Sequence, residues 1–304
     1  MKNTIDDRCV EVLSSLNDEE GALYYQKSEL INKSLGKGLQ KQHRIIVLFN
    51  WLNGLAHQYK SEKEYENAIR ILNMMLALCP TNPITHNNLG VVYLELGKIN
   101  LAEKEVQIAH QLKPESAMYL DLLFIIQSKQ GHYTDILNES IALINKYPLN
   151  ENIRSWYGHA LLKLNRAEEA IEVLKGSLVL DKTSRAARIL LAEAYMDCEQ
   201  YEDAITLCKL SYRLDPKDVD ILEILGNAYG IVGEYELAER AFRKALKLNP
   251  KEKFAAVGLL LALKKQEKIS DALFNEFKGN IQTFCQLQAL ENEMEGGDKS
   301  ETLY

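Results

Sequence analysis

Large apolar residues recur along this chain in a pattern that repeats every 34 residues. They stand at positions 7 and 11 in most blocks and at position 4 in half of them, which is the three- and four-residue spacing of one helix face. Two more stand at positions 17 and 24, and a proline follows near position 32. Proline stops a helix because it lacks an amide hydrogen and clashes with the preceding turn. The pattern therefore predicts a helix at positions 2–14, a turn, and a second helix at positions 18–31.

The prolines fix the period and the block boundaries. Five of the six prolines lie at intervals of 34, 34, 68 and 34 residues, and Lys182 occupies the missing place. They are Pro80, Pro114, Pro148, Pro216 and Pro250. Cutting the chain on this period gives six blocks without insertion and a seventh, degenerate one. The blocks are 49–82, 83–116, 117–150, 151–184, 185–218, 219–252 and 253–286, between an N-terminal helical extension at 1–48 and an acidic tail at 287–304.

Two positions of the block carry small residues. Position 8 reads Ala56, Gly90, Phe124, Gly158, Ala192 and Gly226, and position 20 reads Ala68, Ala102, Ile136, Ala170, Ala204 and Ala238, with Ala272 extending the second series. We expect these positions to face each other where the paired helices cross, because only small side chains let two backbones approach closely.

The third block departs from this rule, with Phe124, Ile136 and Leu143 at positions that are small elsewhere. Its two helices are expected to approach less closely. Either this block changes the curvature of the stack or presents the apolar run 122–126 to a partner, or local repacking absorbs the extra bulk.

The flanks are predicted to close the ends of the stack. Ile5, Cys9, Leu13 and Leu16 form one helical stripe, and residues 18–34 are expected to form a second helix before the Gly36–Gly38 breaker. The helix of the first block is expected to begin well before residue 49. At the other end a closing helix is predicted from Ile281, Phe284, Leu287, Leu290 and Met294.

The sixth block resembles the consensus of the tetratricopeptide repeat, a 34-residue helix-turn-helix unit. The matching residues are Leu222, Leu225, Gly226, Tyr229, Tyr235, Ala238, Phe242, Ala245 and Pro250. The resemblance implies an all-α, right-handed α-solenoid superhelix of about seven repeats with helical caps. It also implies a concave groove that binds another protein or peptide.

The same resemblance implies which residues face the groove, mainly at positions 2, 5, 9, 12 and 13 of the first helix. The candidate partner-binding residues are Asn50, Asn53, His57, Asn87, Asn88, Val91, Leu94, Met118, Asp121, Ile125, Ser155, His159, Leu162, Ile189, Glu193, Met196, Asp197, Asp220, Glu223 and Asn227.

The middle of this groove is expected to be apolar and its far wall acidic. Ile84, Val91, Leu94, Met118, Ile125, Leu162, Ile189 and Met196 form the apolar strip, which suits a helical or extended apolar segment. The alternative is that the N-terminal segment of the chain itself fills the groove. Glu193, Asp197, Asp218, Asp220 and Glu223, relieved by Lys217, form an acidic wall for a basic segment, or else are merely solvated charges.

One subtype of the family is disfavoured. Repeat proteins that clamp the carboxylate of heat-shock chaperones place lysine, arginine and asparagine at fixed groove positions. The matching residues here are Asn53, His57, Asn88, Met118 and Leu122, of which only Asn88 fits.

Charge and composition exclude several classes of function. Acidic residues outnumber basic ones by 43 to 36, giving a net charge of −7, the wrong sign for binding nucleic acid. The first thirty residues carry charges throughout, so neither a signal peptide nor a membrane anchor is expected, and the predicted location is cytoplasmic.

Candidate chemistry is sparse. Five scattered cysteines (Cys9, Cys79, Cys198, Cys208 and Cys285) and six histidines show no metal-binding spacing, and no nucleotide-binding or nucleophile motif occurs. No cofactor, metal or catalytic residue is expected. The sequence predicts a non-catalytic adaptor, scaffold or chaperone-like binder; the alternatives are a self-assembling scaffold and, with less support, a peptide-responsive regulator.

Overall fold

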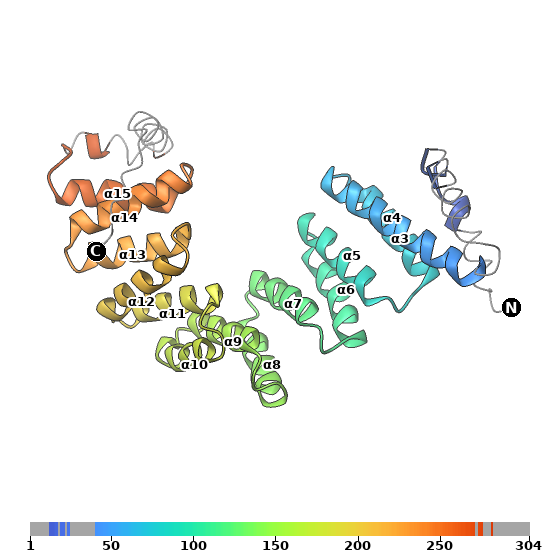
Figure 1. Ribbon diagram of the computed structural model, residues 1–304, viewed down its shortest axis with the longest axis horizontal. Coiled ribbons are helices and arrows are strands. Elements are labelled where there is room, and N and C mark those ends of the chain that lie inside the picture. Colours follow the sequence, from blue (N-terminus) through green and yellow to red (C-terminus); the bar gives the residue numbers. More distant parts are fainter. Residues whose placement is uncertain are drawn as a thin grey trace. The chain divides into compact units, whose positions relative to one another are not determined.

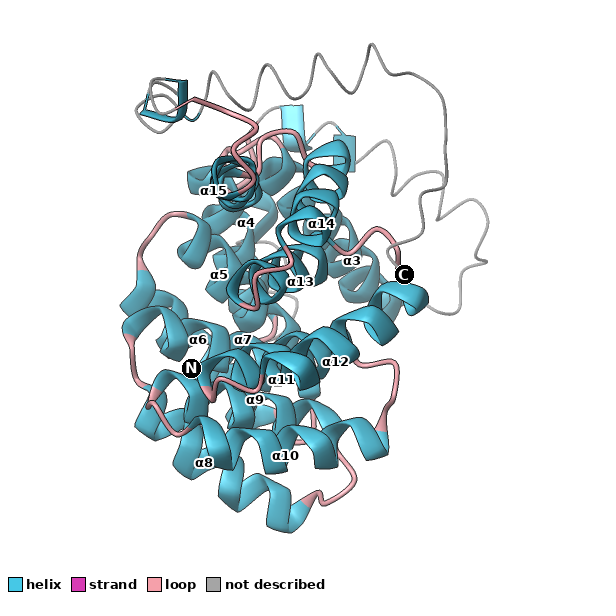
Figure 2. Ribbon diagram, turned by 90° about the vertical axis from the view of Figure 1, so that its left-hand side faces the viewer, coloured by secondary structure: helices cyan, strands magenta, loops and turns pink. Residues whose placement is uncertain are grey.

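The computed structural model describes residues 12–17, 19–21, 23–24, 40–270, 273–275 and 281. In this part of the chain every regular element is an α-helix, and short loops join the helices (Figure 2). The predicted all-α class is confirmed. Figure 1 labels the helices α3 (Gln40–Ser61), α4 (Tyr65–Leu78), α5 (Pro83–Glu95), α6 (Ile99–Leu112), α7 (Ala117–Gln130), α8 (Tyr133–Lys146), α9 (Glu151–Lys163), α10 (Ala167–Leu180), α11 (Arg185–Asp197), α12 (Tyr201–Leu214), α13 (Val219–Ile231), α14 (Tyr235–Leu248) and α15 (Lys253–Lys265).

The helices follow the predicted blocks to within one residue. In the sixth block the pattern predicts helices at 220–232 and 236–249, and the structure has Val219–Ile231 and Tyr235–Leu248. The first block begins with a longer helix, α3, which starts at Gln40 as expected. The seventh block supplies α15 as its first helix.

The chain divides into two compact units, Met1–His132 and Tyr133–Tyr304. The division falls at the turn between α7 and α8, the two helices of the third block, which is the block with unusually large residues. Phe124 and Ile136 are both fully buried. Of the run 122–126 only Ile125 is exposed, so the run as a whole does not form an exposed surface.

Glycine at position 8 makes room for a large side chain of the second helix. A Cβ atom built on Gly158 lies 2.5 Å from Leu174 Cδ2, and one built on Gly226 lies 2.7 Å from Phe242 Cε1. Both partners stand at position 24. The expected contact between positions 8 and 20 is therefore incomplete: at Gly90 the Ala102 carbonyl oxygen is 3.3 Å away, but Val106 at position 24 is nearer, at 2.3 Å.

Every turn from a first to a second helix has the same backbone geometry. Position 15 is left-handed in all seven described repeats, at Lys63, Gly97, Gly131, Asn165, Glu199, Gly233 and Glu267. The amide of position 16 donates to the carbonyl of position 11 each time, as from Gln200 to Tyr195 at 2.8 Å. This is the Schellman ending, which satisfies carbonyls that the helix leaves free. The seventh repeat keeps it, so its turn is regular.

Position 34 begins the next repeat by capping it. Asn82, Asn150, Ser184 and Asp218 each accept a hydrogen bond from the backbone amide three residues further on. Such caps satisfy amides that have no partner inside the helix. Ser116 and Glu252 stand at the same position and make no side-chain cap.

The described N-terminal residues pack on the first repeat. Asn17 and Glu20 form a capping box, in which each side chain accepts a hydrogen bond from the other's amide at 2.8 and 3.0 Å. The Glu20 carboxylate also accepts a hydrogen bond from the Tyr59 hydroxyl at 2.7 Å and pairs with Arg70. Burial alone would raise the pKa of Glu20, but the hydrogen bonds from Arg70 and Tyr59 outweigh it and lower the pKa.

Other described N-terminal contacts lie beside these. Val12 is buried in the core of this unit, Leu13 and Leu16 pack against it, and the Tyr24 ring meets the Trp51 ring edge-on at 5.3 Å. None of the first-repeat residues in these contacts is a predicted groove residue. Within the described part, the N-terminal segment therefore covers the end of the first repeat. Ile5, Cys9 and most of residues 18–34 lie outside the described residues.

Three described residues that follow α15 pack on the core of the second unit. Ile269, Phe274 and Ile281 are partly buried against the cluster that includes Leu259 and Leu263 of α15. Ala272, Phe284, Leu287, Leu290, Met294 and the predicted tail lie outside the described residues.

Candidate functional site

The predicted groove residues fall into two sets, one in each compact unit. In the first unit they lie on α3, α5 and α7. Asn50, His57, Met118 and Ile125 are exposed, and Asn87 is buried. The remaining members are half-buried: Asn53, Asn88, Val91, Leu94 and Asp121. Ile84 of the predicted apolar strip is exposed as well.

Two predicted asparagines of the first unit meet each other. Asn88 donates a hydrogen bond to the Asn53 side chain at 3.3 Å. Beside Asn88, His57 and Lys60 line a cavity of about 10 Å³, which is no larger than one water molecule needs. The α3 and α5 residues thus offer a small polar spot.

In the second unit, α9 contributes less accessible surface than expected. Ser155 and Leu162 are buried. The Ser155 hydroxyl donates to the Glu151 carboxylate at 2.9 Å and lies 3.2 Å from the Ser177 hydroxyl, so it ties two helices together. His159 is half-buried and meets the Trp156 ring edge-on at 5.6 Å. Burial, followed by the charge of Lys163, lowers the pKa of His159 and favours its neutral form.

The acidic wall has a different composition from the one predicted. Asp218 is buried at the start of α13, where it caps the helix and forms two hydrogen bonds of 2.8 Å with Arg185. Arg185 also pairs with Asp220. The cation that neutralises part of this acidic wall is therefore Arg185 and not Lys217. The sequence did not lead us to predict Arg185. The signal was available, because residues 33 and 35 positions apart are neighbours in stacked 34-residue repeats.

Two carboxylates of this wall, Glu193 and Glu223, form no ion pair with a described residue. Burial raises the pKa of Glu193, Lys163 opposes this, and Asp197 and Asp220 add to it. Burial raises the pKa of Glu223 to about 7, with further contributions from Glu252 and Asp220. The Oε1 atom of Glu223 is buried and has no hydrogen-bond partner among the described residues.

These residues share one surface of the second unit. We call it the A face: the exposed and half-buried side chains of Glu193, Met196 and Asp197 on α11, Asp220, Glu223, Asn227 and Ile231 on α13, and Leu261 and Lys265 on α15. Helix α13 packs on both α11 and α15. The A face is therefore continuous from α11 to α15.

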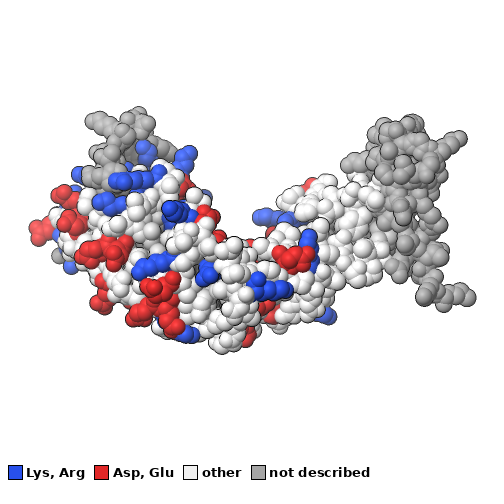
Figure 3. All heavy atoms as spheres, turned by 60° about the horizontal axis from the view of Figure 1, so that its bottom comes forward, with Lys and Arg blue, Asp and Glu red and all other residues white. Residues whose placement is uncertain are grey.

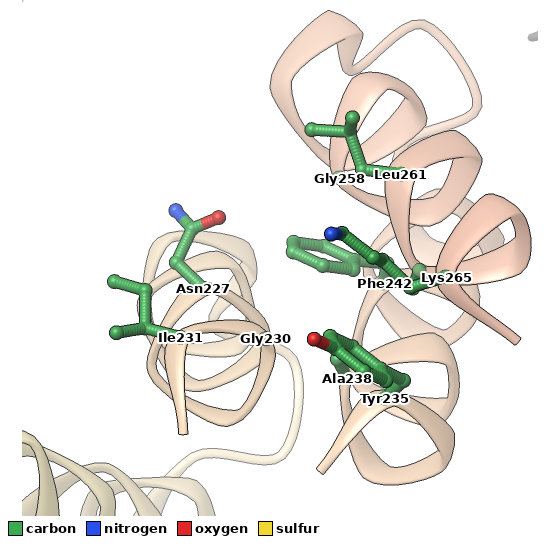
Figure 4. A pocket seen from close by; sticks show the side chains of 11 residues that line it. Asn227, Gly230, Ile231, Tyr235, Ala238, Phe242, Gly258, Leu261 and Lys265 are labelled. Carbon is green, nitrogen blue, oxygen red and sulfur yellow. The ribbon is translucent and has the colours of Figure 1, made fainter. Parts of the chain in front are cut away.

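The A face ends in a pocket that the sequence analysis did not predict. It has a volume of about 270 Å³ and lies between α13, α14 and α15. Figure 4 shows Asn227 and Ile231 on one side, Leu261 and Lys265 on the other, and the Phe242 ring between them. Asn227 was a predicted groove residue, whereas no residue of α15 was among the candidates. The regular frame would have placed Leu261 and Lys265 at positions 9 and 13.

The described residues offer little other chemistry. No group of three metal-binding side chains lies close together in the described part, and Cys79, Cys198 and Cys208 are free thiols there. Burial, followed by Asp218, raises the pKa of Cys208 to about 12. None of the described helices is long and apolar enough to cross a membrane. Figure 3 shows acidic and basic side chains interspersed over the described surface of the second unit in that view.

Three protein-family models match segments of this chain. The family model described as "Tetratricopeptide repeat" matches residues 219–252, which is the sixth block in the same frame, and "TPR repeat" matches 56–97. A third model, "Anaphase-promoting complex, cyclosome, subunit 3", matches 142–210.

One curated relative matches the chain at low sequence identity. The anaphase-promoting complex subunit cut9 of Schizosaccharomyces pombe is 24% identical over 195 residues, covering 62% of this chain and 26% of that protein. The chain thus spans about a quarter of the length of this relative.

Two solved structures are similar to the chain. A tetratricopeptide repeat protein from Parabacteroides merdae has a TM-score of 0.60 at 16% identity, over 83% of this chain and 94% of the other. The Cut9–Hcn1 hetero-tetramer of the anaphase-promoting complex has a TM-score of 0.59 at 15% identity. The match covers 84% of this chain and 48% of the other. The repeat frame and the helix pairs agree with the matching models, so the described part of the chain folds as a series of tetratricopeptide repeats.

Proposed function

We propose that this protein is a non-catalytic scaffold that binds a basic segment of another protein on the A face of its second unit. The observation that carries the proposal is the pair Glu193 and Glu223. Both carboxylates are partly withdrawn from water, and both have pKa values raised by burial and by neighbouring acids.

A cation from a partner would relieve this arrangement. Arg185 already pairs with Asp218 and Asp220, so it is engaged elsewhere. A lysine or arginine of a partner placed beside Glu223 would offset the repulsion from Glu252 and Asp220. Such complementarity raises the rate of association and fixes the register of the bound segment.

The comparisons favour a role in a multi-protein assembly. The cut9 protein is named as a subunit of the anaphase-promoting complex, and one matching model describes another subunit of that complex. This supports a scaffold bound to other proteins; it names no partner for this chain.

The test is charge reversal on the A face. Partners are first isolated from the native extract with the intact protein and identified by mass spectrometry. Binding of the identified partner is then measured for the triple variant Glu193→Lys, Asp197→Lys and Glu223→Lys at low and high salt. The expected result is a loss of affinity that is largest at low salt, because salt screens these charges.

The matched control reverses acids on the other helices of the same repeats. Glu202 on α12 and Glu236 on α14 are exposed and have no ion pair in the described structure. The variant Glu202→Lys, Glu236→Lys should bind as the wild type does. Unchanged affinity of the triple variant at low salt would eliminate the proposal. Light scattering over a range of concentrations tests self-assembly: a mass that grows with concentration favours the self-assembling scaffold instead.

A further inference from the structure

The floor of the pocket at the end of the A face is an apolar ring, that of Phe242, which is fixed by close packing. A Cβ atom on Gly258 would lie 2.3 Å from Phe242 Cζ, and one on Gly226 would lie 2.7 Å from Phe242 Cε1. The Phe242 ring is therefore held between α13 and α15 by two glycines. Gly230 also lines the pocket, and nothing lies within 4 Å of a Cβ atom built there. The space above the ring is open on the α13 side.

The size of the pocket suits one side chain of a partner. Its volume of about 270 Å³ lies below the roughly 300–1,000 Å³ of pockets that bind whole small molecules. Apolar rims on both sides, Ile231 at 55% and Leu261 at 49% exposure, extend it along the A face. A leucine, methionine or phenylalanine side chain would bury apolar surface on both rims and on the ring.

The polar groups at the pocket specify what lies next to that side chain. Among the described lining residues Lys265 is the one with a full charge, and it is exposed. Neither Lys265 nor Asn227 has a hydrogen-bond or ion-pair partner in the described structure, and both side chains lie at the pocket in Figure 4. A lysine attracts a carboxylate, and an asparagine amide both donates to and accepts from a peptide backbone.

The geometry points to a partner segment in which a large apolar side chain enters this pocket and a neighbouring Asp or Glu pairs with Lys265. This inference rests on the proposed function and extends it. Along the A face the charges run from acidic on α11 and α13 to basic at Lys265 on α15. The complementary segment carries a basic residue, then an apolar one, then an acidic one.

The experiment uses a displayed library of random dodecapeptides selected on the intact protein. An enriched peptide is then synthesised with a fluorescent label, and its affinity is measured by anisotropy. Gly230→Leu places a side chain in the open side of the pocket. No atom lies within 4 Å of a Cβ atom at this position and leucine favours the helix more than glycine does, so α13 is expected to form at least as well as in the wild type. Circular dichroism checks this. Gly54→Leu, at an exposed helical glycine of α3 with equally open surroundings, is the matched control.

The expected result is an enriched pattern of a basic, an apolar and an acidic residue in that order along the A face. The affinity should be reduced about ten- to a hundredfold by Gly230→Leu and unchanged by Gly54→Leu. Lys265→Glu should weaken binding a few-fold, as a partly exposed ion pair allows, and a peptide with Lys in place of its acid should restore it. Lys247→Glu on α14 makes the same charge change away from the pocket and should have no effect.

Other outcomes overturn the inference. Equal peptide affinity for the wild type and for Gly230→Leu would contradict the inference about the pocket. If the Glu193 and Glu223 reversals still weaken binding of the same peptide, the proposed function stands without the pocket. Failure to enrich any peptide above the level obtained with the Gly230→Leu protein counts against the pocket as well. A dimer in sedimentation that Gly230→Leu dissociates would make a second copy of the chain the occupant, contrary to the partner inferred.

Discussion

Phe242 sets the spacing of α13, α14 and α15 through its contacts with two glycines. Its ring is 3% exposed, and no side chain on Gly226 or Gly258 could fit beside it without a shift. At Gly230, one turn further along α13, the surroundings are open. Two glycines of one helix therefore have different roles, one in packing and one in leaving the pocket accessible.

This difference predicts opposite effects of the same substitution. Gly226→Ala should lower the free energy of unfolding by about 1–3 kcal/mol, because the ring must move within a packed core. Gly230→Ala should raise it by about 1 kcal/mol, because alanine favours the helix and meets no neighbour. Urea unfolding followed by circular dichroism measures both. Equal effects would show that the two glycines are not packed differently.

Glu223 gives the second unit a pH dependence of stability. Its folded pKa of about 7 lies above the ordinary value of 4.5, so the folded state holds this proton more tightly than the unfolded chain does. The favourable contribution is complete below pH 4.5 and is lost as the pH rises towards 7.

Glu223→Gln should remove this loss. We expect the variant to gain stability relative to wild type as the pH rises from about 4.5 to 7, by roughly 1 kcal/mol once the partial exposure of the side chain is allowed for. Thermal unfolding across this range measures the difference. A difference that stays constant with pH would contradict the assignment.

The turns between paired helices share a left-handed residue, but the residue types differ. Glycine takes this conformation at Gly97, Gly131 and Gly233, whereas Lys63, Glu199 and Glu267 carry side chains there. A left-handed residue with a side chain costs roughly 1–2 kcal/mol, which glycine avoids at some entropic cost in the unfolded chain.

Introducing glycine at this position should therefore raise the stability, and removing glycine from it should lower the stability. Glu199→Gly is expected to stabilise the second unit by about 0.5–1 kcal/mol, and Gly97→Ala to destabilise the first by about 1 kcal/mol. Both positions are exposed, and nothing lies within 4 Å of a Cβ atom on Gly97, so the effects report the backbone alone. Denaturant unfolding provides the measurement. Stabilisation by Gly97→Ala would show that the left-handed turn is not retained.

Over the whole molecule, the division at His132 and Tyr133 separates two sets of core contacts. In repeat proteins each repeat is stabilised mainly by its neighbours, so a local change weakens nearby repeats most. Gly226→Ala is therefore expected to speed amide hydrogen exchange in α13 to α15 and to leave α3 to α6 nearly unchanged. Exchange measured by mass spectrometry tests this, and a uniform loss of protection would show that the chain unfolds as one unit.

The sequence by itself determined the class, the repeat frame and the helix bounds, because these depend on signals within one repeat. Periodic apolar positions, prolines near position 32 and small residues at position 8 all act locally. The sequence of the seventh block matches the repeat pattern poorly, so it did not indicate a binding site there. Helix α15 nevertheless follows the repeat frame, and its residues Leu261 and Lys265 complete the pocket.

Only the tertiary structure decided how neighbouring repeats meet. It buried Asn87, Ser155 and Leu162, which the family pattern places towards a partner. It also set the Phe242 ring between two glycines of different helices. The physical reason is that accessibility and charge pairing depend on the rotation between stacked helices and on side-chain rotamers. A 34-residue period specifies that helices stack, and the packing of individual side chains then fixes which surfaces remain open.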